Sequence, residues 1–154
     1  MTEYNLTIDQ YPPKWEDAEE HMQINISTKI NFSESNEKVS KALKNIFPNL
    51  EIMIDKQNKL RGSSTNIEIL FHFLKLIFDQ RILDVARKCV IDGKENENSP
   101  KTVFYLNKQT AFINKVSFST FSESPLGPIK ISIECEKLDF LIDQYFPKFE
   151  WFVK

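Results

Sequence analysis

The sequence has few of the residues that build catalytic and metal sites. Its two cysteines, Cys89 and Cys135, belong to no CxxC or CxxH pattern, which argues against a zinc site or a dithiol redox motif. Its two histidines, His21 and His72, have no Ser, Cys or Asp at the spacing of a catalytic triad or a metal site. Its 3 glycines form neither GxGxxG nor GxxxxGK, so no phosphate-cradling loop is expected. We therefore predict no catalytic residues, no metal and no cofactor, and a protein that is not an enzyme.

Long apolar runs are also missing. No stretch approaches the roughly 18 apolar residues that a helix needs to cross a bilayer. The first ten residues, MTEYNLTIDQ, lack the basic region and the following apolar run of a secretory signal. We expect a cytoplasmic protein with no membrane contact. Free thiols are the simpler interpretation of the two cysteines, and a bridge between them, which needs Cα atoms within about 7 Å, stays open.

Charge is low overall but uneven along the chain. The net charge is −2 over 154 residues, a length typical of one domain. Residues 1–22 hold one lysine and six acids, residues 23–133 hold 16 basic residues and 11 acids, and residues 134–154 hold three lysines and five acids. A mildly basic body thus lies between two acidic ends, which permits a polyanionic partner without demonstrating one.

The acidic start of the chain differs from the rest in pattern as well as in charge. Residues 1–21 contain a pair of prolines and a run of acids, and they show no sustained period. We predict that they form a loosely ordered extension, with Tyr11 or Trp15 pinned on the body. Residues 22–154 are expected to form a single domain.

Hydrophobic periodicity predicts the elements of that domain. Alternation over Gln23–Phe32 is typical of a strand with one face in water, and helical spacing follows it. An apolar stripe from about Asn66 to Ile91 predicts one long helix, or two joined near Arg81, begun by a capping box at Thr65 and Glu68. The other expected elements are strands at 50–54, 59–63, 103–106, 112–118 and 129–133, and a last helix at 138–146. The order β-α-β-β-α(long)-β-β-β-α indicates an α+β fold, an antiparallel sheet with helices packed on one face.

Two basic residues on the predicted long helix, Arg81 and Arg87, suit contacts to phosphate. Asp79 and Asp84 lie on the same helix and offer each arginine an ion-pair partner, an effect of roughly 0.2 to 0.5 kcal/mol. The sequence leaves both interpretations open.

A polar tip is expected between the strands at 103–106 and 112–118. It holds Asn107, Lys108 and Gln109, whose amide and ammonium groups can bond to phosphates, sugars or base edges, and Lys115 follows. The alternative is an ordinary polar hairpin turn with core aromatics behind it.

Three motifs, in this order, resemble a known family. They are Arg81-Ile-Leu-Asp-x-Ala-Arg87, then Leu106-Asn-Lys-Gln-x-Ala-Phe112 followed by Lys115-Val116, then Glu123-Ser-Pro-Leu-Gly-Pro-Ile129. The chain resembles, over about residues 23–147, an archaeal family of uncharacterised proteins described as predicted RNA-binding or exosome-associated. The resemblance implies a fold similar to that of the ribosomal protein that binds 5S RNA. It also implies that the binding residues fall within the motifs: Arg81, Arg87, Asn107, Lys108, Gln109 and Lys115.

Our leading hypothesis is a non-catalytic RNA-binding accessory protein, related to RNA processing or to the ribosome. The four cations among the six residues would contact phosphates, and the two amides would touch sugars or bases. The alternative is a structural or protein-interaction module without nucleic-acid binding, such as a homodimer formed through sheet edges or the aromatic tail Phe146–Phe152.

Overall fold

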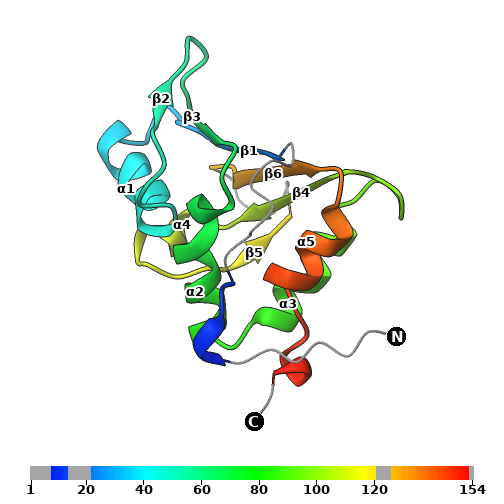
Figure 1. Cartoon of the computed structure of the whole chain (residues 1–154). Coiled ribbons are helices and arrows are strands. Elements are labelled where there is room, and N and C mark those ends of the chain that lie inside the picture. The colour runs from blue at the N-terminus through cyan, green and yellow to red at the C-terminus, as the bar shows by residue number, and fades with distance from the viewer. Residues whose placement is uncertain (1–7, 14–21, 121–125, 153–154) are drawn as a thin grey trace.

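The computed structural model describes residues 8–13, 22–120 and 126–152. Its strands are β1 (Met22–Lys29), β2 (Met53–Ile54), β3 (Lys59–Ser64), β4 (Lys101–Leu106), β5 (Phe118–Ser119) and β6 (Ile129–Cys135). They form one six-stranded sheet in the order β2-β3-β1-β6-β4-β5, and every neighbouring pair is antiparallel (Figure 1).

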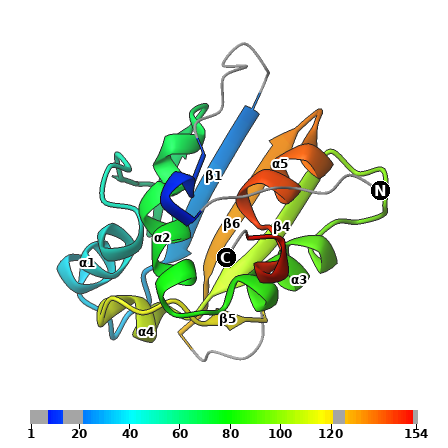
Figure 2. The same cartoon turned by 60° about the horizontal axis from the view of Figure 1, so that its bottom comes forward.

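Helices cover one face of this sheet (Figures 1 and 2). The α-helices are α1 (Asn36–Ile46), α2 (Phe71–Asp79), α3 (Leu83–Asp92), α4 (Lys108–Phe112) and α5 (Leu138–Tyr145). The short 3-10 turns are η1 (Ile8–Gln10), η2 (Ile67–Leu70) and η3 (Phe149–Trp151). The predicted α+β fold, an antiparallel sheet with helices packed on one face, is confirmed. Among the described residues, no helix combines the length and the apolar character that crossing a membrane requires.

The alternation of β1 produces the two-sided sheet. Ile24 and Ile26 are 0% and 1% exposed in the core under the helices, whereas Gln23 and Asn25 are exposed on the other face. Burying one such isoleucine side chain stabilises the fold by roughly 2 kcal/mol. Because successive side chains of a strand point to opposite faces, the residues that anchor the core also determine which polar side chains the other face presents.

The stripe predicted as one long helix forms two helices, the other arrangement that the sequence allowed. Arg81 adopts a left-handed backbone conformation, with φ of 60°, just after α2 ends, and its N–H donates to the Phe78 carbonyl at 3.0 Å. Gln80 fixes this junction, because its side-chain amide donates to the Val116 carbonyl at 2.9 Å and accepts from the Val116 N–H at 2.8 Å. The chain therefore turns sharply between α2 and α3.

Two local predictions are wrong. Asn66, rather than Thr65, caps the helical segment, because its side chain accepts from the Glu68 N–H at 3.0 Å. The strand expected at 112–118 is reduced to β5, since the preceding residues form α4 and the chain turns at Asn114 with φ of 63°. Asn is one of the few residues that tolerate this left-handed conformation.

Tyr11 ties an early segment of the chain to the helical layer. Its hydroxyl donates to the Tyr145 carbonyl at 2.6 Å, and its ring centroid lies 5.4 Å from that of Phe78 and 5.7 Å from that of Phe152. Phe152 is itself buried. The aromatic tail considered as a dimer contact thus packs against its own domain. Trp15, the other predicted anchor, lies outside the described residues.

Candidate nucleic-acid interface

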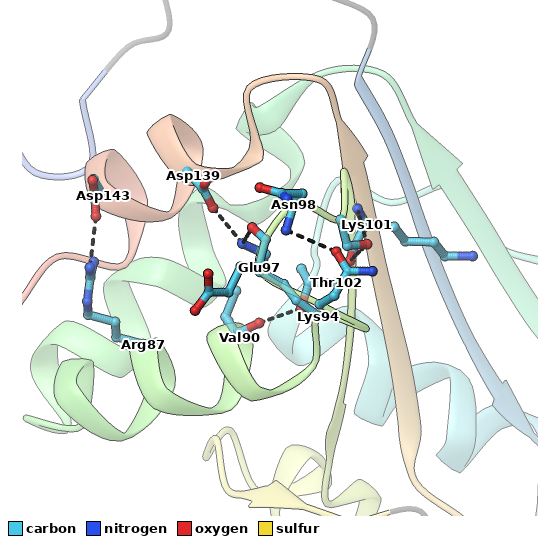
Figure 3. A network of polar contacts seen from close by, with 11 residues as sticks. Arg87, Val90, Lys94, Glu97, Asn98, Lys101, Thr102, Asp139 and Asp143 are labelled. Atoms are coloured by element: carbon cyan, nitrogen blue, oxygen red, sulfur yellow. Dashed lines mark hydrogen bonds and ion pairs between the residues drawn. The ribbon is translucent and has the colours of Figure 1, made fainter.

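Arg87, predicted to bind phosphate, is engaged within the protein's own framework. Its guanidinium donates to the Asp143 carboxylate at 2.8 Å (Figure 3). It also donates to the Phe146 carbonyl at 3.0 Å. It also lies 4.7 Å from the ring centroid of Trp151, a cation–π distance. The partner that neutralises this arginine comes from α5, not from Asp84 on its own helix as the sequence suggested.

A second ion pair joins the end of α3 to α5. The Lys94 ammonium donates to the Asp139 carboxylate at 2.6 Å and to the Glu97 carbonyl at 2.8 Å (Figure 3). Two cations of the α3 segment are therefore occupied by acids of the neighbouring helix. This side of the domain has less positive charge for a polyanion than the sequence suggested.

Lys108, expected at an exposed tip, is in fact buried, with 4% of its surface exposed. Its ammonium lies 3.0 Å from the Glu34 carboxylate and donates to the Lys29 carbonyl at 2.7 Å and to the Leu126 carbonyl at 3.0 Å. The expectation of a solvent-facing ammonium is wrong because three segments converge on it. Lys108 holds the end of β1 against the turn that precedes β6.

Glu34 shows how strongly this arrangement is fixed. Burial alone would raise the pKa of its carboxyl, but hydrogen bonds from Asn31 and the ammonium of Lys108 outweigh that effect and keep the pKa below its ordinary value. Asn31 contributes both its backbone N–H, at 2.9 Å, and its side-chain amide, at 2.7 Å. Glu34 is therefore charged at neutral pH, and Asn31 and Lys108 stabilise that charge.

The other predicted residues are dispersed. Asn107 caps α4, because its side chain accepts from the Thr110 N–H at 3.0 Å. Arg81, Gln109 and Lys115 are exposed. The hollow that Gln109 lines with Lys108 shares no residue with those lined by the two arginines. The structure therefore does not bring the six predicted residues together into one site.

The face of the sheet opposite the helices, which we call the open face, has a different character. Its side chains come from alternate positions of four strands, and the residues between them point into the core. They are Gln23, Asn25, Ser27 and Lys29 of β1, Lys59, Arg61 and Ser63 of β3, Lys101, Val103 and Tyr105 of β4, and Lys130, Ser132 and Glu134 of β6.

The strand register places these side chains in rows. One row runs through Arg61, Ser27, Lys130 and Tyr105, which are successive Cα partners from β3 across β1 and β6 to β4. Adjacent strands lie about 4.8 Å apart, so this row spans roughly 14 Å. Two shallow hollows in the open face, one toward β2 and one toward the turn before β6, both include Ser27 and Lys130.

Positive charge dominates the open face. Its cations within the described residues are Lys29, Lys59, Arg61, Lys101 and Lys130. Arg61 is paired with Asp55 at 2.5 Å, and Lys101 lies opposite Glu134 in the register. Hydrogen bonds from the Lys59 backbone and from Arg61 hold the pKa of Asp55 below its usual value, so that acid is charged. The remaining three lysines have no ion pair within the described part of the chain.

The sequence contained part of this signal. Basic residues stand at water-facing positions of β1, β3, β4 and β6, but the sequence pattern predicts a face in water only for Gln23–Phe32. Lys130 comes to lie between Ser27 and Tyr105 because β6 inserts between β1 and β4. Periodicity along one strand does not reveal this long-range pairing.

The acidic, histidine and cysteine side chains of the described residues are scattered. No group of three or more His, Cys, Asp or Glu among them lies close enough to hold a metal ion. Cys89 and Cys135 are free thiols. Burial, and then the nearby charge of Asp92, raises the pKa of Cys89, which disfavours the reactive thiolate at neutral pH.

Comparison with known proteins identifies the family of the chain. A family model whose description reads "RNA binding" matches residues 23–135. A UPF0201 protein of Sulfurisphaera tokodaii is 35% identical over 130 residues, which cover 82% of this chain and 88% of that protein. A UPF0200/UPF0201 protein of Archaeoglobus fulgidus is 36% identical over 120 residues, or 78% of this chain, and the match spans 35% of that longer protein.

Solved structures agree with this relationship. A crystal structure of a UPF0201 protein from Methanococcus jannaschii matches with a TM-score of 0.69 at 30% identity, covering 82% of this chain and 93% of that one. Another UPF0201 crystal structure matches with a TM-score of 0.70 at 34% identity, covering 82% and 94%. The similarity to the ribosomal protein that binds 5S RNA stays a prediction. The chain belongs, with these archaeal UPF0201 proteins, to the family whose model is described as RNA binding.

Proposed function

We propose that this protein is a non-catalytic RNA-binding protein and that its open face contacts the RNA backbone. The observation that carries the proposal is the gathering of five cations from four strands on the face that the helices leave uncovered: Lys29, Lys59, Arg61, Lys101 and Lys130. The family description supports the choice of RNA as the polyanion. An accessory role in RNA processing or at the ribosome, in the cytoplasm, fits a protein that binds RNA without cutting it.

Phosphate contacts would supply most of the affinity. Each contact releases condensed counterions, so log K falls with log salt by about 0.7 per neutralised phosphate on a single strand. Asn25, Ser27 and Ser63 lie between the cations and carry amides and hydroxyls that can bond to sugars and base edges. The open face thus combines a charged surface for positioning with polar groups for local recognition.

Arg81, Gln109 and Lys115 remain candidates for an additional contact, because all three are exposed. They belong to α4 and to the segments that join helices and strands, not to the strands of the open face. We propose that they touch RNA only where it extends beyond the sheet. Arg87, Asn107 and Lys108 have structural partners and would act by maintaining the fold.

A titration of labelled RNA by fluorescence anisotropy at several salt concentrations tests the proposal. We expect the double variant Lys101→Gln with Lys130→Gln to bind more weakly and to reduce the salt slope by about 1.4, the value for two lost phosphate contacts on a single strand. The matched control replaces Lys44 of α1 and Lys88 of α3, both exposed on the helical layer, with Gln. The control should leave affinity and slope unchanged.

Three results would contradict the proposal. They are no binding by the unaltered protein, a binding constant that does not change with salt, and an equal loss in the control variant. Unfolding curves of both variants establish that any loss of affinity does not come from loss of the fold.

A further inference from the structure

The two hollows of the open face differ in charge, because Glu51 and Asp55 line the one toward β2 and no acid among the described residues lines the other. This second hollow lies at the end of the sheet where β1 finishes, with a volume of about 330 Å³. Lys29, Lys59 and Lys130 line it, and no acidic residue does so within the described part of the chain. The other two cations of the open face have an acidic neighbour, since Arg61 pairs with Asp55 and Lys101 lies opposite Glu134 in the register. We call this feature the lysine hollow.

Two of its lysines are placed directly against each other. Lys29 of β1 and Lys59 of β3 are Cα partners in the antiparallel ladder, and both side chains belong to the open face. Like charges directly opposite each other on neighbouring strands destabilise a sheet. Lys130 is added from the next strand, since its Cα partner is Ser27, two residues before Lys29. A bound anion would relieve the repulsion among these three ammonium groups.

The wall of the hollow is preformed by the turn before β6. The Thr28 hydroxyl donates to the Pro128 carbonyl at 3.1 Å, and the buried Lys108 ammonium donates to the Leu126 carbonyl at 3.0 Å. The Asn31 side-chain amide also donates to the Leu126 carbonyl. A wall held in this way does not have to be ordered when a ligand binds, which lowers the cost of binding.

Gly127 lies at the edge of this wall. Its φ of 83° is left-handed, and no atom lies within 4 Å of the place where a side chain would begin. A ligand can therefore approach the backbone closely at this point, which a larger residue would hinder.

The far side of the hollow is formed by Tyr105. It is the Cα partner of Lys130 and lies on the same face of the sheet. An aromatic ring beside ammonium groups is the arrangement with which proteins hold single-stranded nucleic acids, the base on the ring and the phosphate on the cations.

We propose that the lysine hollow binds one nucleotide of single-stranded RNA, its phosphate among Lys29, Lys59 and Lys130 and its base against Tyr105. This inference rests on the proposed function and adds a preference for unpaired RNA. Bases in an A-form duplex are stacked and paired, so they cannot reach a ring on a sheet, whereas an unpaired base can turn toward it.

The test compares a single-stranded oligonucleotide with a duplex of the same length, both titrated against the unaltered protein and two variants. We expect Tyr105→Leu to weaken single-strand binding by about 5- to 150-fold, the range of one lost base–aromatic stack, and to leave duplex binding unchanged. Tyr105→Phe keeps the ring and should bind the single strand as the unaltered protein does. Melting temperatures confirm that both variants are folded.

The outcomes separate the two proposals. If the unaltered protein binds neither RNA, the proposed function fails and the nucleotide site with it. If it binds RNA with the expected salt dependence but Tyr105→Leu has no effect, or weakens single-strand and duplex binding equally, the nucleotide site is overturned and the proposed function stands.

Discussion

The guanidinium of Arg87 lies 2.8 Å from the Asp143 carboxylate and thereby joins α3 to α5. The same side chain reaches the Phe146 carbonyl and the face of Trp151. One arginine therefore connects α3, α5 and the turn η3 that follows α5. Both charged side chains are mostly shielded, with 16% and 26% of their surfaces exposed. This degree of burial separates the pair from ordinary surface ion pairs, which contribute little.

Replacing Arg87 with alanine should therefore reduce the stability of the fold and leave the affinity for RNA unchanged. We expect a loss of about 2 kcal/mol in the free energy of unfolding, because a mostly shielded carboxylate and a carbonyl lose their donor. Urea unfolding followed by circular dichroism measures the loss, and anisotropy measures RNA affinity. A large drop in affinity with stability preserved would mean that Arg87 contacts RNA, as the motif resemblance implied.

Removing the charge of Lys108 should lower the free energy of unfolding more than removing Arg87 does. Lys108→Met keeps the length of the side chain but leaves the mostly shielded Glu34 carboxylate without its cation, and we expect a loss of about 3 kcal/mol in the free energy of unfolding. Adding Glu34→Gln to this variant should recover part of the loss, because the uncompensated charge is then gone. A double-mutant cycle in urea checks this, and additive losses would argue against coupling between the two residues.

The same pair predicts a pH dependence. The pKa of Glu34 in the folded protein lies below its ordinary value of 4.5, so the carboxylate binds its proton more weakly than in the unfolded chain. Its contribution to stability is complete above about pH 4.5 and is lost as the pH falls toward the folded pKa. The free energy of unfolding should therefore fall less steeply below pH 4.5 in Glu34→Gln than in the unaltered protein. Equal slopes from urea curves at several pH values would contradict this assignment.

Much of the fold follows from local pattern. Ile24 and Ile26 alternate with polar residues and form a strand, and the apolar stripe around Phe73 and Ile77 forms a helix under the sheet. The stripe predicts either one helix or two joined near Arg81 and does not decide between them, because Arg81 is not a residue that marks a left-handed turn. What determines the break after α2 is Gln80, whose partner Val116 is distant in sequence.

The surface proposed to bind RNA is harder to predict from the sequence. Lys108 stands between polar residues, as exposed loop residues often do. It is nevertheless buried, and its ammonium contacts Glu34 and two carbonyls that are distant in sequence. Conversely, Lys29 and Lys130 have nothing unusual in their local sequence, and they come together with Tyr105 only through the strand order. Both errors have one cause: local pattern predicts which residues face water along one element, but not which distant segments become its neighbours.

The opposition of Lys29 and Lys59 leads to a last prediction, in which function and stability move in opposite directions. Lys29→Gln removes one of two like charges that face each other across neighbouring strands. We expect the free energy of unfolding to rise by about 0.3 kcal/mol at low salt, within the range of cross-strand pair effects. The gain should shrink as added salt screens the repulsion. Because the same ammonium is proposed to hold phosphate, RNA affinity should fall in the variant that is more stable.

Urea unfolding at two salt concentrations and an RNA titration give both readouts, with Lys44→Gln on α1 as the control. A variant that loses both stability and affinity would mean that Lys29 serves the fold, and the lysine hollow would lose its main support as an anion site.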